Sequence, residues 1–100
     1  VAHITGGGIA GNLARVLRDD VDAVVRRRTW EMPRIFEEIR HSGEVSDEEM
    51  ERVFNLGIGM IVAVPANDAF KAMDLLREKG HRAVRVGEVV GGRGAVHLER

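Results

Sequence analysis

The chain has no cysteine and no tyrosine, and its 100 residues include only two prolines and one tryptophan. The absence of cysteine excludes disulfides and thiolate chemistry, and it permits a reducing compartment. The formal net charge is −1, so the composition does not favour binding to nucleic acid or to an anionic membrane. No apolar run approaches the roughly 20 residues of a membrane span, and no signal-peptide pattern is present. We therefore expect a cytoplasmic protein.

Apolar residues make up 44% of the chain and charged residues 31%, which is typical of a soluble globular protein. One hundred residues suffice for one domain that buries roughly two-thirds of its unfolded surface. The chain starts at Val1 without a methionine, and Val1 already belongs to a strand pattern. This start predicts a piece of a longer polypeptide, so residues 1–100 are interpreted as a single partial domain.

The first motif is a triple-glycine turn, Gly6 to Gly8, between a short strand and a helix. Glycine permits positive φ and a close approach of the backbone to a ligand. A helix that starts at Gly8 would direct N–H groups and its positive dipole end toward the turn, which suits a phosphate or another anion. Thr5 adds a hydroxyl, and Asn12 and Arg15, one helical turn apart, are candidates to flank the same site.

Two familiar phosphate-binding motifs do not fit this turn. No Gly-Lys-Ser/Thr follows it, which excludes a Walker loop, and no acidic residue follows a second strand as in the dinucleotide fingerprint. The alternative to an anion-binding turn is a tight strand-to-helix turn without a ligand. A second glycine segment, Phe54 to Met60, contains Asn55, Gly57 and Gly59.

Hydrophobic periodicity predicts the order β-α-β-α-α-β-α-β-β. Strands are expected at 1–5, 21–26, 60–64, 82–90 and 95–99, and helices at 9–17, 33–41, 47–54 and 67–79. Residues 60–64 are continuously apolar, which predicts a strand buried on both faces. Ser46 with Glu49 forms a capping box, and Gly80 marks a helix C-terminus. This order predicts an α/β fold (an α+β sandwich), with one mixed sheet and helices packed mainly on one face.

Several charged or polar residues have two interpretations. Arg26 to Arg28 form a basic run, either a solvated strand edge or a contact for a substrate phosphate or a partner subunit. Trp30 is interpreted as a core or interface anchor. His3 precedes the glycine turn, where it is either a hydrogen-bonded structural residue or a proton carrier. The spacing of the four histidines predicts no metal site.

Two motifs together, His3-Ile4-Thr5-Gly6-Gly7-Gly8 and Phe54-Asn55-Leu56-Gly57-Ile58-Gly59-Met60, resemble the aminoimidazole ribonucleotide synthetase family, the phosphoribosylformylglycinamidine cyclo-ligases of purine biosynthesis. The resemblance covers nearly the whole chain and corresponds to the closing part of the family's C-terminal domain. Formylglycinamidine ribonucleotide amidotransferase, selenophosphate synthetase, thiamine-phosphate kinase and a hydrogenase-maturation protein share the architecture, but the His-Ile-Thr-Gly-Gly-Gly form favours the cyclo-ligase.

The resemblance implies ATP-driven closure of formylglycinamidine ribonucleotide to aminoimidazole ribonucleotide. It implies that ATP and Mg²⁺ are bound mainly by an N-terminal half, which also forms a homodimer, and that the substrate is a small ribonucleotide. It places a set of candidate residues at the substrate or phosphate: Thr5, Gly6, Gly7, Gly8, Asn12, Arg15, Asn55, Gly57 and Gly59. His3 is a possible orienting or proton-handling group. The chain alone is expected to be inactive.

A freestanding ligand-binding or dimerisation module of the same superfamily is the alternative hypothesis. It is supported by the lack of a self-sufficient catalytic set among these 100 residues. No serine lies in a nucleophile elbow, and no carboxylate pair requires a catalytic role.

Overall fold

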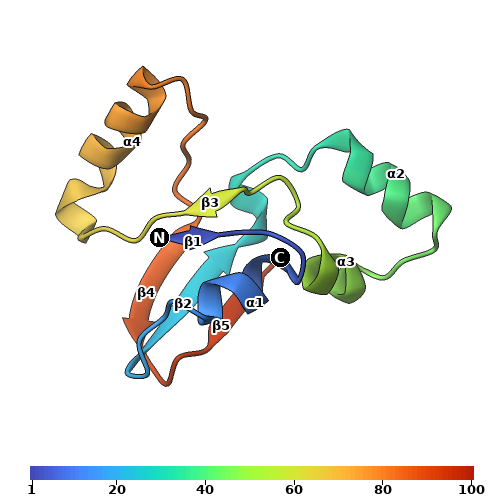
Figure 1. Ribbon diagram of the computed structural model, residues 1–100, viewed down its shortest axis with the longest axis horizontal. Coiled ribbons are helices and arrows are strands. Elements are labelled where there is room, and N and C mark those ends of the chain that lie inside the picture. The colour runs from blue at the N-terminus through green and yellow to red at the C-terminus, as the bar shows by residue number, and fades with distance from the viewer.

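The computed structural model describes all 100 residues (Figure 1). Its elements follow the order β1 (Ala2–His3), α1 (Gly8–Ala14), β2 (Val21–Arg26), α2 (Arg34–Ser42), α3 (Asp47–Val53), β3 (Met60–Ile61), α4 (Ala69–Glu78), β4 (Gly87–Gly91) and β5 (Val96–Glu99). Short 3-10 turns lie at Arg27–Thr29 and Ala66–Asp68. The α/β class and the predicted element order are confirmed. None of the helices is long and apolar enough to span a bilayer.

The strands form two sheets, so the prediction of one mixed sheet was wrong. In the larger sheet the order is β4-β2-β5, with β2 antiparallel to β4 and parallel to β5. The smaller sheet is the antiparallel pair β1–β3, in which Ala2 pairs with Ile61 and His3 with Met60. The pairing is short because the chain leaves β1 for the glycine turn soon after His3. The strand expected at 82–90 forms only from Gly87, where its pairing with β2 begins.

The core lies between α1, the small sheet and the central strand β2. Its six fully buried members are Ala2, Ile4, Ile9, Leu13, Ala23 and Val25. The alternation of Ala23 and Val25 directs one face of the larger sheet toward α1, which lies across β2 and β5 in Figure 1. Only ten residues of the chain are buried, so this core is small.

Residues 60–64 are not buried on both faces, contrary to the prediction. Met60 is 59% exposed and Val62 45%, because β1 covers only one edge of this segment and α4 stands away from it (Figure 1). The residues predicted to mark helix ends are confirmed. Ser46 Oγ accepts a hydrogen bond from Glu49 N at 3.2 Å, and Gly80 follows α4 with φ of +88°.

The outer face of the larger sheet carries a polar cluster around Asp22. Its Oδ1 accepts hydrogen bonds from Arg93 N at 2.8 Å and Ala95 N at 2.9 Å, and its Oδ2 lies 2.9 Å from His97 Nε2. The bond with His97, followed by the two backbone bonds, lowers the pKa of Asp22 to about 2. Asp22 thereby ties the turn before β5 to the central strand.

We predict that Asp22→Ala destabilises the fold and removes part of its acid sensitivity. A lowered carboxyl pKa contributes stability that is present above about pH 4 and lost as the pH falls through about 2. The free energy of unfolding, measured with denaturant between pH 2 and pH 7, should therefore change less with pH in the variant than in the wild type. Asp19→Ala, an exposed carboxylate in the adjacent turn, is the control and should retain the wild-type slope. An unchanged slope in Asp22→Ala would contradict the assignment.

Candidate functional site

The two glycine segments lie side by side because β1 pairs with β3. The ladder continues past the strands, since Ile4 N donates to Gly59 O at 2.9 Å. On the other side of the turn, Gly7 N donates to Val53 O at 3.2 Å. The first turn is thus held between the second glycine segment and the end of α3.

Asn12 organises the first turn from inside. It is buried, and its Nδ2 donates to Gly8 O at 2.7 Å, to Thr5 O at 3.3 Å and to Gly6 O at 3.4 Å. Thr5 Oγ1 donates to Asn12 Oδ1 at 3.2 Å. These bonds satisfy the Asn12 amide within the protein, so Asn12 and Thr5 shape the turn rather than present free polar groups to a ligand.

The glycines of the turn have different physical requirements. Gly7 and Gly8 have φ of +100° and +77°, a region that side chains other than glycine rarely adopt. A Cβ on Gly8 would overlap the backbone oxygen of Glu51, so Gly8 also permits the close packing of α1 on α3. Gly8 N donates to Thr5 O at 3.3 Å. The Gly7 amide donates to Val53, so the Gly6 amide is the one glycine N–H of the turn that has no partner inside the protein.

The second glycine segment is held by two side chains. Asn55 Oδ1 accepts a hydrogen bond from Gly57 N at 2.9 Å, which closes a tight turn. Trp30 Nε1 donates to Leu56 O at 3.0 Å, and the partly buried Trp30 packs against the core, in agreement with its interpretation as a core or interface anchor. Leu56 is buried with φ of +56°, and Gly57 has φ of +100° against the ring of Pro33.

His3 and Arg15 lie at different distances from the turn. The His3 side chain is exposed on β1 and makes no hydrogen bond, so it is available to solvent two residues before Thr5. Arg15 follows the last residue of α1. A helix rises 1.5 Å per residue, which places Arg15 about 10 Å from Gly8. Arg15 is therefore exposed about two helical turns beyond the start of α1.

A hollow of about 300 Å³ adjoins the turn between α1 and α3. It is lined by Gly7, Ala10, Gly11, Glu48, Glu51, Arg52 and Leu98. Arg100 pairs with Glu48 at 3.2 Å and with Glu51 at 2.9 Å. The pKa of Glu48 lies below its ordinary value because its own backbone N–H and Arg100 stabilise the carboxylate. These carboxylates do not favour a phosphate in this hollow.

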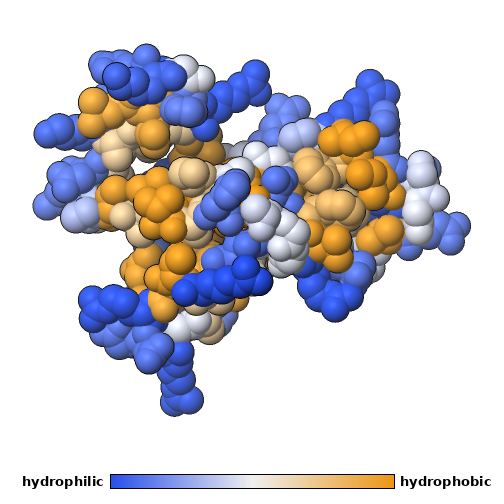
Figure 2. Space-filling model, viewed as in Figure 1, coloured by the Kyte–Doolittle hydropathy of each residue, from blue (hydrophilic) through white to orange (hydrophobic).

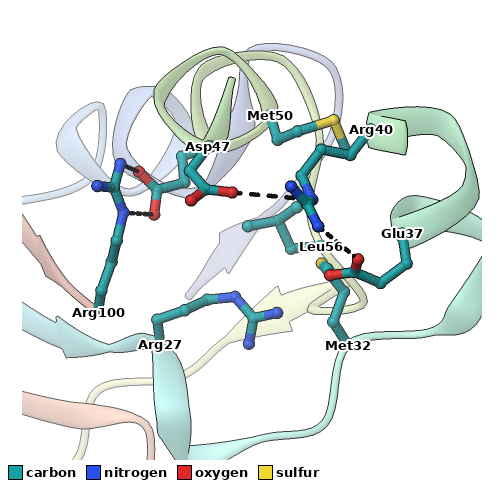
Figure 3. Close-up of a pocket in the computed structure, with 9 residues that line it drawn as sticks. Arg27, Met32, Glu37, Arg40, Asp47, Met50, Leu56 and Arg100 are labelled. Atoms are coloured by element: carbon teal, nitrogen blue, oxygen red, sulfur yellow. Dashed lines mark hydrogen bonds and ion pairs between the residues drawn. The ribbon is translucent and has the colours of Figure 1, made fainter. Parts of the chain in front are cut away.

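A second pocket, of about 180 Å³, lies beside Leu56 and is shown in Figure 3. Arg40 on its wall pairs with Glu37 at 2.9 Å and with Asp47 at 3.9 Å. Arg27 also lines this pocket, and its guanidinium stacks on the Trp30 ring at 4.9 Å from the ring centroid.

The basic run has structural partners at two of its three positions. Arg26 pairs across the larger sheet with Glu88 at 3.1 Å and with Glu99 at 3.7 Å. Arg27 is held by Trp30, both through its ring and through a hydrogen bond to its carbonyl oxygen at 3.3 Å. Arg28 is exposed. The run therefore acts mainly within the fold.

Two supporting residues were not identified from the sequence as parts of this region. Val53 and Glu51 act through backbone carbonyl groups, which no side-chain pattern reveals. Trp30 was recognised as an anchor, but its partner Leu56 lies 26 residues away along the chain. No local motif could have indicated that contact.

We predict that Gly8→Ala destabilises the protein by about 2 kcal/mol or more, through backbone strain and overlap with the Glu51 carbonyl. Gly11→Ala is the matched control on the same helix, because a Cβ there meets nothing within 4 Å. It should be neutral or stabilise by roughly 0.5–1 kcal/mol. Denaturant unfolding measures both changes, and equal stability of the two variants would contradict the packing described here.

The model of the family "AIR synthase related protein, C-terminal domain" matches residues 1–99. The phosphoribosylformylglycinamidine cyclo-ligase of Caldanaerobacter subterraneus subsp. tengcongensis is 46% identical over 98 residues, which are 98% of this chain and 29% of that protein. The cyclo-ligase of Bordetella pertussis is 46% identical over 90 residues, 90% of this chain and 26% of that protein. That of Thermoanaerobacter sp. (strain X514) is 42% identical over 98 residues, again 98% and 29%.

The chain thus spans less than a third of the length of these relatives. The match runs through both glycine segments and confirms the resemblance drawn from them. By this match over nearly its whole length, the chain belongs to the family of AIR synthase related proteins, as their C-terminal domain.

Proposed function

We propose that the full-length protein closes the imidazole ring of aminoimidazole ribonucleotide from formylglycinamidine ribonucleotide, with ATP, in de novo purine biosynthesis. One observation supports this most directly: the hydrogen bond from Ile4 N to Gly59 O brings together the two glycine segments, in a chain whose relatives carry the name phosphoribosylformylglycinamidine cyclo-ligase. In this proposal the chain contributes the side of the active site that faces the substrate and its phosphate.

The proposed binding surface is the side of the first turn that carries Gly6. Its amide has no partner inside the protein, and backbone amides are suitable donors to phosphate oxygens. Thr5 and Asn12 hold the turn in shape, and Gly7 and Gly8 provide its left-handed backbone.

Around this surface, Asn55, Gly57 and Gly59 form the opposing wall. His3, exposed and unbonded, is the proposed proton-handling group. Arg15 acts only on a part of the substrate distant from the turn. Phosphoryl transfer depends mainly on positioning and charge stabilisation, so such a site needs few ionisable groups.

ATP and Mg²⁺ are assigned to the preceding part of the full-length protein. No group of three His, Asp or Glu side chains converges in this chain, and the proposal leaves the metal to that preceding part. The preceding part is also proposed to form the homodimer, in the cytoplasm.

We predict that Gly7→Asp in the full-length protein lowers kcat/KM for ring closure at least about a hundredfold, because it adds a negative charge to an anion-binding turn. Gly7→Asn is the matched variant. Asparagine tolerates positive φ and has nearly the same shape without the charge, so it should retain much more activity. ATP-dependent product formation is measured beside thermal unfolding, which checks that both variants fold.

Gly91→Ala, on β4 with open space around its Cβ, serves as the activity control. Full activity of Gly7→Asp would overturn the role of the turn. A full-length protein that binds the ribonucleotide but never closes the ring would instead support the binding-module hypothesis.

We also predict that residues 1–100 alone form no aminoimidazole ribonucleotide from the substrate and ATP. The chain lacks a metal-binding cluster and covers under a third of its relatives. The same product assay applied to the isolated chain checks this, and ATP-dependent product from the chain alone would refute the proposed division of the site.

A further inference from the structure

The chain exposes more surface than a compact protein of its size. Its accessible surface is 7058 Å², whereas a folded monomer of 11.0 kDa has about 5,600 Å². The radius of gyration is 13.9 Å, against about 12.7 Å for a compact domain of this length. The excess, about 1,400 Å², is larger than the roughly 800 Å² that one partner buries in a standard interface.

Six of the thirteen large apolar residues that are exposed lie on two neighbouring segments of the chain. We define the α4–β3 surface by the exposed apolar residues of α4 and of residues 60–64: Met60, Val62, Val64, Phe70, Leu75 and Leu76. Phe70 is 77% exposed, although α4 has the spacing of an amphipathic helix. Among the helices, strands and 3-10 turns of the chain, α4 packs mainly against the preceding turn Ala66–Asp68. Figure 2 shows apolar atoms over α4 and over the adjoining strands, facing each other across an opening.

The backbone of residues 60–64 also has a free edge. Gly59 O accepts from Ile4 N, and Ile61 pairs with Ala2, so the odd-numbered positions direct their backbone groups toward β1. In an antiparallel strand the alternate residues point the other way. The Met60 amide therefore faces an edge that no strand of this chain occupies, and residues 62–64, which follow β3, pair with no strand.

We propose that the part of the full-length polypeptide that precedes this chain adds a β-strand to the free edge of residues 60–64 and fills the space beneath α4 with apolar side chains. Residues 60–64 then become an internal strand covered on both faces, and the amphipathic face of α4 gains its missing layer. A two-stranded sheet is marginal in water, whereas three or more strands with a covered apolar face are stable.

The segment that covers the α4–β3 surface is inferred from the lengths of the relatives and from the description of the matching family. More than two-thirds of each relative lies outside the matched region. Because the matching family is a C-terminal domain, the unmatched remainder precedes it in those proteins. A covalently connected segment also reaches the surface at a high effective concentration, unlike a separate partner. The inference rests on the longer protein of the proposed function, but not on its chemistry.

Cysteine labelling of the full-length protein tests the covering. Val62→Cys and Phe70→Cys introduce thiols on the α4–β3 surface, and Lys71→Cys places one on the exposed neighbouring position. The chain has no cysteine of its own, so mass spectrometry of labelled peptides identifies each site without background. We expect both surface thiols to react with a maleimide at least about tenfold more slowly than the Lys71→Cys thiol, and all three to react alike after denaturation.

Hydrogen exchange of the full-length protein tests whether a strand is added to residues 60–64. It uses the protein without substitutions, so the result does not depend on a variant that fails to fold. We expect slow exchange at the amides of Val62 and Val64, since each would donate to the added strand. Fast exchange there, or equal labelling of Phe70→Cys and Lys71→Cys, would overturn the proposal. Protection that appears only at concentrations where the protein self-associates would assign the surface to a second copy, and would also overturn it. Neither readout depends on ring closure, so a failure of the proposed function remains distinguishable.

Discussion

The hydrogen bond from Ile4 N to Gly59 O, with the short β1–β3 ladder that it extends, is the constraint on which the rest of the candidate site depends. It joins segments more than fifty residues apart along the chain. Asn12 then determines the shape of the first turn, and Trp30 holds the second segment through Leu56. Each of these bonds uses a backbone group, so the site is a shaped main-chain surface with few ionisable side chains.

The same short ladder leaves one part of the chain less covered than the rest. Two residues of pairing leave residues 60–64 open on one edge and exposed on one face. The larger sheet, in contrast, is held together by residues of its own strands, because Asp22 bonds to the turn before β5 and Arg26 pairs with residues of β4 and β5. In the proposed arrangement, the candidate site lies on the part of the molecule that the preceding polypeptide covers.

Much of the fold was predictable because its signals are local. One or two residues are enough to mark a helix end, as Ser46 with Glu49 does for α3 and Gly80 does for α4. Hydrophobic periodicity gives the element order. The strand at 60–64 was predicted from its apolar run, yet the structure pairs only Met60–Ile61. Strand pairing is non-local, and an apolar run cannot specify which partner covers it or whether that partner belongs to the same 100 residues.

The residue pattern was sufficient to predict the α/β class, the order of the elements and the two glycine motifs that indicate the family. Each follows from residue type and spacing along the chain. The packing of the chain, which the residue pattern does not reveal, turns Asn12 and Thr5 inward and divides the strands into two sheets. The physical reason is that hydrogen-bond partners such as Val53 O and Gly59 O are backbone atoms, whose positions depend on packing and leave no mark in the residue pattern.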